Sequence, residues 1–86
     1  MKIREGFSIR EIRDRVYVID ETGEAPKMHY LNETGVFLWE LCAQGLTVEA
    51  MKQKILDEYV VDEATVKADI ADFLAGLRQI GALEND

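Results

Sequence analysis

The side chains that most often carry chemistry are scarce in this sequence. It has one histidine, His29, and one cysteine, Cys42, and it lacks the Cys-x-x-Cys, His-x-x-x-His or clustered carboxylates that indicate a metal site. Cys42 lies in an apolar run, so we expect a core thiol rather than a nucleophile activated by His29. Asp69 and Asp72 could form a general acid–base pair, but their spacing on an acidic segment is more typical of a solvated helix face. The residue types therefore predict no catalytic site, no metal site and no cofactor.

Length and composition predict one small globular domain over residues 1–86. The chain is 48% hydrophobic and 31% charged, a composition that can fold around a single core. One cysteine allows no internal disulfide, and no apolar run reaches the length of a membrane span or of the core of a secretory signal. These features suit a cytoplasmic protein, which is the location we expect.

Negative charge is concentrated in the second part of the chain. Residues 32–86 hold four basic and eleven acidic residues, a net charge of −7 that equals that of the whole chain. Such acidity argues against partners that are nucleic acids or anionic membranes. Solubility is the simplest interpretation, and the alternative is that the few basic residues in this part mark a binding strip.

The first third of the chain is predicted to form strands. Residues 7–12 and 16–19 are rich in β-branched and aromatic side chains, and we expect a hairpin with its turn at Asp14-Arg15. After a polar loop, residues 27–31 are expected to form a third strand. Pro26 precedes that strand and favours an edge position, because proline cannot donate to a ladder.

Three helices are predicted in the remainder, which makes the fold class α+β with the order βββααα. Each helix begins after a residue that can accept from free backbone N–H groups: Asn32, Thr47 and Asp62. Gly45 and Gly81 are expected to end the first and third helices, and the second should span about 48–59.

The third helix, predicted over 63–80, has the strongest apolar periodicity. Its apolar residues recur at three- and four-residue steps and predict one core stripe of Val66, Ile70, Phe73, Leu77 and Ile80. Leu83, beyond this helix, should fold back onto the core. Trp39 on the first helix fits the core better than a stacking platform at the surface.

A set of short motifs follows the order of a known family signature. The chain carries, in order, Leu31-Asn32-Glu33-Thr34-Gly35, Phe37-Leu38-Trp39-Glu40-Leu41, Gly45-Leu46-Thr47-Val48-Glu49, Tyr59-Val60-Val61-Asp62 and Gly81-Ala82-Leu83-Glu84. Together these segments resemble the PqqD-like family over nearly the whole chain. The resemblance implies a winged-helix-like domain, in which a three-stranded antiparallel sheet precedes three helices.

The same resemblance implies a function. Domains of this family bind the leader of a ribosomally made precursor peptide and present it to a modifying enzyme, often a radical S-adenosylmethionine (radical SAM) protein. The leader adds as a strand to the third strand, in a groove closed by the third helix. We therefore expect a non-catalytic peptide chaperone, with a precursor leader and a radical SAM or other maturation enzyme as partners.

The residues give this implied role a physical basis. An edge strand would offer unpaired N–H and C=O groups to an extended peptide at Lys27, Met28, His29, Tyr30 and Leu31. A second stripe on the third helix is predicted to form the groove wall, with an apolar centre and basic ends suited to an acidic leader: Lys67, Ala71, Leu74 and Arg78. The alternative is that Leu74 belongs to the core and that the two basic residues only aid solubility.

Two other classes of protein remain open. A DNA-binding winged helix shares the architecture, but the second helix has Lys52 and Lys54 among acidic neighbours. A structural module could pair its exposed third strand with that of a second copy and form a homodimer. An enzyme is the class that we expect least.

Overall fold

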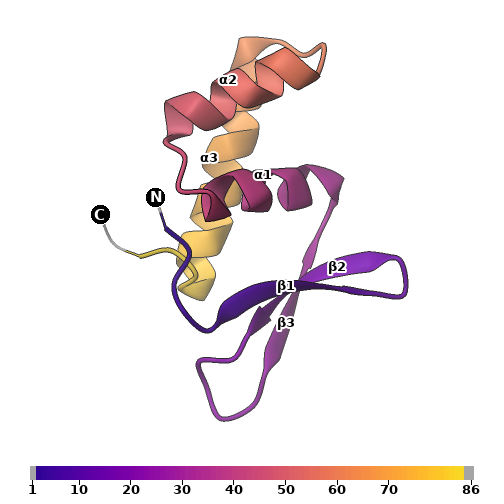
Figure 1. The fold of residues 1–86 in the computed structure, drawn as a ribbon, viewed down its shortest axis with the longest axis vertical. Coiled ribbons are helices and arrows are strands. Elements are labelled where there is room, and N and C mark those ends of the chain that lie inside the picture. Colours follow the sequence, from indigo (N-terminus) through magenta and orange to yellow (C-terminus); the bar gives the residue numbers. More distant parts are fainter. Residues whose placement is uncertain (1, 85–86) are drawn as a thin grey trace.

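The computed structural model describes residues 2–84 and has the predicted order βββααα (Figure 1). The sheet is antiparallel with the order β1-β2-β3, formed by β1 (Phe7–Ile12), β2 (Arg15–Asp20) and β3 (Lys27–Leu31). The helices are α1 (Glu33–Ala43), α2 (Val48–Glu58) and α3 (Glu63–Ile80). In Figure 1 the sheet lies below the helices, and α3 passes behind α1 and α2. Within residues 2–84, no helix combines the length and the apolar character that a membrane crossing requires.

The β1–β2 hairpin turns at Arg13 and Asp14, one residue earlier than predicted. Their φ angles are 50° and 69°, and positive values at both central residues are characteristic of a type I′ turn. This turn is favoured because its twist matches that of the flanking strands. Arg15, which we expected in the turn, instead begins β2 and lies opposite Ile12.

The register of this hairpin sets the direction of the backbone groups of β2. In a two-residue hairpin the residues that flank the turn form a hydrogen-bonded pair, and hydrogen-bonded pairs then alternate along the ladder. The hydrogen bond from Glu21 N–H to Gly6 O, at 2.8 Å, agrees with this alternation, because Gly6 and Glu21 are the next hydrogen-bonded pair beyond the two strands. The residues of β2 that bond towards β3 are therefore Val16, Val18 and Asp20.

The same alternation leaves one side of β3 open. Lys27, His29 and Leu31 lie opposite those three β2 residues, so their backbone groups are used in the β2–β3 ladder. The N–H and C=O groups of Met28 and Tyr30 point away from β2. Among residues 2–84 no strand pairs with β3 on that side, because β3 is the last strand of the sheet.

The structure confirms all three predicted N-caps. In each, a side-chain oxygen accepts from the backbone N–H three residues further on, at 2.7 Å for Asn32, 3.1 Å for Thr47 and 2.7 Å for Asp62. Gly81 ends α3 in the left-handed conformation, as predicted, with a φ of 81°. α2 ends at Glu58, one residue earlier than expected, because Tyr59 is extended.

The core lies where α3 packs against the other helices and the sheet. Its buried residues on α3 are Val66, Ile70, Leu74 and Leu77. Leu74 is 4% exposed, so it belongs to the core, as the alternative interpretation held, and not to an exposed wall. Phe73 and Ile80, which we placed in the core stripe, are only partly buried. Trp39 and Cys42 are buried as predicted.

The segments at the two ends of the described chain lie side by side (Figure 1). Ile3 forms an antiparallel bridge with Leu83, and Arg4 Nη1 donates to Gly81 O at 2.7 Å. Leu83 is buried, which confirms its predicted return to the core. These contacts hold the end of α3 against the segment that leads into β1.

Candidate functional site

The open edge of β3 leads into a hollow between the sheet and the helices. This hollow has a volume of about 400 Å³ and lies where the end of β3 meets the first turns of α1 and the middle of α3. Its walls are Tyr30, Leu31, Asn32, Thr34, Gly35, Leu38, Asp69, Asp72 and Phe73. We call it the edge hollow. It lies beside β3, where an added strand would have to lie.

The side chains of β3 alternate between the two faces of the sheet. Met28 and Tyr30 are exposed, whereas His29 and Leu31 are partly buried on the core side. Tyr30 packs edge-on against Tyr17, which lies directly opposite, with ring centroids 6.1 Å apart. On the core side, His29 Nε2 is buried with no hydrogen-bond partner among the residues that the structure describes.

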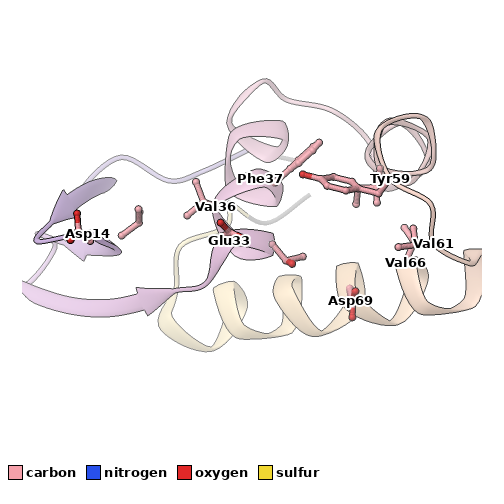
Figure 2. A pocket seen from close by; sticks show the side chains of 11 residues that line it. Asp14, Glu33, Val36, Phe37, Tyr59, Val61, Val66 and Asp69 are labelled. Atoms are coloured by element: carbon pink, nitrogen blue, oxygen red, sulfur yellow. The ribbon is translucent and has the colours of Figure 1, made fainter.

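A larger cavity adjoins the edge hollow, and Figure 2 shows the side chains that line it. Its volume is about 600 Å³, within the range of ligand-binding pockets. The cavity is walled by the β1–β2 turn, α1, the end of α2 and α3, through Asp14, Val16, Glu33, Thr34, Val36, Phe37, Ile55, Tyr59, Val61, Val66 and Asp69. We call it the apolar cavity, because most of these side chains are apolar. Thr34 and Asp69 line both spaces, so the two are neighbours that share part of their walls.

The predicted groove wall of α3 lies elsewhere. Lys67, Ala71, Leu74 and Arg78 line a separate hollow of about 280 Å³ together with the first residues of α2. The face of α3 beside β3 instead presents Asp69, Asp72 and Phe73. The structure thus brings the β3 residues together with acidic and aromatic residues of α3, and it does not bring them together with the basic stripe.

The charged side chains that line these two spaces are all acidic. The side chains that line the edge hollow and the apolar cavity include four carboxylates and no basic group: Asp14, Glu33, Asp69 and Asp72. Two basic side chains near β3 have other contacts. Lys27 lies opposite Asp20 in the ladder, and Arg15 lies over the ring of Tyr30 at 5.9 Å from its centroid.

One ion pair joins α2 to α3 on the side of the basic stripe, and a second lies within α2. Lys52 Nζ lies 2.8 Å from Glu49 Oε1 and 2.9 Å from Glu63 Oε1. These hydrogen bonds raise the pKa of Lys52 above its usual value, and the same contact with Lys52 lowers the pKa of Glu63. The Lys52–Glu63 pair links the start of α3 to α2.

The groups that could perform covalent or metal chemistry are not assembled at the edge hollow. Cys42 is fully buried, and burial raises the pKa of its thiol, which disfavours the reactive thiolate. No group of three or more His, Cys, Asp or Glu side chains within residues 2–84 is arranged to hold a metal ion. What the arrangement can do is bind an extended chain along β3 and enclose side chains in the adjoining spaces.

Sequence reasoning missed the residues that line these spaces on α1 and α3. Thr34 occurs within a helix-opening motif, and Phe73 fits the apolar stripe, so neither was expected at a site. Asp69 and Asp72 were considered for acid–base chemistry and interpreted as a solvated face; both are exposed, and both line the edge hollow. The feature of the sequence that could have indicated this wall is the position of Asp69 and Asp72 on the side of the apolar stripe of α3 where Phe73 lies.

Two solved structures with bound leader peptides are similar to this chain over nearly its whole length. TbiB1, solved in complex with the TbiA(beta) leader peptide, has a TM-score of 0.82 and 30% sequence identity, with 100% of this chain and 98% of TbiB1 covered. A lasso peptide synthetase B1, solved with its leader peptide, has a TM-score of 0.78 and 19% identity, with 98% and 96% covered, and shows the shared fold. No curated protein sequence matches the chain significantly. Residues 13–83 match the family described as coenzyme PQQ synthesis protein D (PqqD), and the chain therefore belongs to the PqqD family.

Proposed function

We propose that this protein is a non-catalytic recognition domain for the leader of a ribosomally made precursor peptide. The leader adds as a fourth strand along the open edge of β3 and is then presented to a maturation enzyme. Membership of the PqqD family and the likeness to a leader-bound TbiB1 support the proposal. A radical SAM protein as that enzyme, and a cytoplasmic location, stay predictions from the sequence.

The observation that carries the proposal is the direction of the β3 backbone. The peptide groups of Met28 and Tyr30 face the open edge, beside the edge hollow. Unpaired groups in such a row are a template for an extended peptide, whose main-chain bonds provide affinity while side-chain pockets provide specificity. Lys27, His29 and Leu31 contribute by holding β3 onto β2 rather than by bonding to the peptide backbone.

The test uses proline at an edge-facing position. Met28→Pro removes an N–H that faces the open edge and leaves the β2–β3 ladder intact, because proline is tolerated on edge strands. Met28→Ala is the matched control, since it removes the same side chain but keeps the N–H. We expect Met28→Pro to weaken binding of the leader of a precursor encoded nearby by roughly tenfold. Met28→Ala should weaken binding by less than about threefold.

Chemical shifts locate the contact independently. When the ¹⁵N-labelled chain is titrated with that leader, the largest amide shifts should lie in 27–32, in 34–38 and around residues 69–73. Shifts confined to α2 and to the basic stripe of α3 would contradict the proposal. Equal binding by Met28→Pro and the parent chain would contradict it as well.

Pairing between two copies of the chain would use the same edge. A homodimer through β3 would cover the peptide groups of Met28 and Tyr30, so it would compete with the leader. Sedimentation at several protein concentrations, with and without leader, separates the two cases. We expect a monomer that becomes a 1:1 complex, and a dimer that dissociates when leader is added would identify the homodimer as the resting state.

A further inference from the structure

We propose that the peptide segment recognised by this protein is cationic, with basic residues next to an apolar anchor. This inference rests on the proposed function and names the class of peptide that the same site accepts. It reverses the expectation from the sequence, in which the basic stripe of α3 suited an acidic leader. The reversal follows from which flank of α3 lies beside β3.

The edge hollow and the apolar cavity lie next to each other. A peptide paired with Met28 and Tyr30 would lie beside the edge hollow, and the apolar cavity adjoins that hollow at Thr34 and Asp69. The cavity has room for a large side chain, with walls that include Val36, Phe37 and Tyr59 (Figure 2). An apolar side chain next to the strand-forming segment of the peptide could enter this cavity. Its own surface and that of the cavity walls would then be removed from water.

The charged side chains around that anchor would be acidic. Asp69 lies at the junction of the two spaces, with Asp72 one turn further along α3. Glu33 and Asp14 also line the apolar cavity. None of the four is in an ion pair within residues 2–84. An acidic peptide segment here would be repelled, whereas a Lys or Arg beside the anchor would be attracted to Asp69 and Asp72.

The basic side chains on β3, on the adjoining end of β2 and on α3 lie outside the two spaces. Arg15 lies over the Tyr30 ring, and Lys27 lies at the far end of β3, opposite Asp20. Lys67 and Arg78 line the hollow against α2, on the other flank of α3. Within residues 2–84, no Lys or Arg side chain lines either of the two spaces, so their charged lining is acidic.

The experiment selects peptides without assuming a natural leader. A display library of random 15-residue peptides is selected on the full chain, and bound peptides are counter-screened on Met28→Pro to keep those that need the β3 edge. We expect the retained peptides to be enriched in Lys and Arg next to an aromatic or large aliphatic residue. Their affinity should fall several-fold when salt is raised from 50 to 500 mM, because screening weakens exposed charge pairs.

Paired variants assign the charge preference to the junction. Asp69→Asn with Asp72→Asn should weaken binding of the selected peptides by roughly tenfold at low salt and reduce the salt dependence. The control, Glu40→Gln with Asp57→Asn, changes the net charge equally at residues that line neither space, and it should change the affinity by less than about twofold.

The outcomes separate this inference from the proposed function. Retained peptides that are neutral or acidic, or an equal loss in both double variants, would overturn the cationic preference while leaving strand addition in place. A selection in which no peptide depends on Met28 would instead overturn strand addition, and the inference with it.

Discussion

The rings of Phe37 and Tyr59 lie 5.5 Å apart at an angle of 53° and together close one wall of the apolar cavity (Figure 2). Phe37 belongs to α1, whereas Tyr59 follows the last residue of α2. The pair therefore links α1 to the residue that follows α2. Since tilted aromatic pairs contribute about 0.5–1.5 kcal/mol beyond the area they bury, this contact matters for both stability and shape.

Tyr59→Ala should reduce the free energy of unfolding by about 1 kcal/mol, because it removes the ring pair from a residue that is half exposed. Tyr59→Phe is the matched control, which keeps the ring and should lie within about 0.5 kcal/mol of the parent chain. Urea denaturation followed by fluorescence measures both. A Tyr59→Phe variant as unstable as Tyr59→Ala would show that the hydroxyl, and not the ring pair, provides the stability.

Truncation at neighbouring positions of α3 should separate the core from the wall of the edge hollow. Leu74→Ala creates a cavity in the packed core and should cost about 3 kcal/mol of unfolding free energy. Phe73→Ala, at a partly buried residue that lines the edge hollow, should cost less stability but weaken peptide binding. Thermal melts and peptide titrations on the same samples give the comparison. If Phe73→Ala lost as much stability as Leu74→Ala and bound the peptide as well as the parent chain, the assignment of Phe73 to the binding site would be wrong.

Periodicity predicted that α3 has a buried stripe, but it could not predict which flank faces the sheet. With 3.6 residues per turn, Phe73 lies about 60° to one side of Ile70 and Leu74 about 40° to the other, so both fit the stripe. Asp69 lies beyond Phe73, and Lys67 lies beyond Leu74. The side that meets β3 depends on how α3 packs against α1 and the sheet, which is a long-range contact that no local spacing encodes.

Local signals, by contrast, were sufficient for the element order and the caps. Each N-cap side chain bonds within its own helix turn, so its residue type alone predicts where the helix starts. The hairpin turn was misplaced by one residue because Arg13-Asp14 lacks the glycine that usually marks a type I′ turn. The edge position of β3 was predicted from Pro26, and the structure confirms it.

The hairpin turn offers a stabilising substitution. Arg13 adopts a φ of 50°, a conformation that costs a residue with a Cβ about 1 kcal/mol relative to glycine. Arg13→Gly should therefore raise the free energy of unfolding by up to about 1 kcal/mol. Glu24→Gly is the control in an exposed loop without a positive φ, where glycine should destabilise by a few tenths to about 1 kcal/mol through the unfolded chain. If urea denaturation shows that Arg13→Gly and Glu24→Gly change the free energy of unfolding equally, the backbone at Arg13 is not strained.

The N-cap of α3 should contribute to the loss of stability in acid. Hydrogen bonds from the Thr65 N–H and hydroxyl lower the pKa of Asp62 below its usual 3.8. As pH falls, the unfolded chain therefore binds this proton before the folded chain does. The stabilisation is present above about pH 4 and is lost as pH falls through the lowered pKa.

Asp62→Asn isolates this contribution, because asparagine caps as well as aspartate and does not titrate. The urea midpoint at pH 7 should stay close to that of the parent chain, and its decline between pH 5 and pH 2.5 should become shallower. Asp57→Asn, which removes a carboxylate outside the caps, is the control and should leave most of the decline in place. If urea midpoints measured across this range fall equally steeply in Asp62→Asn and in the parent chain, the cap does not couple folding to pH.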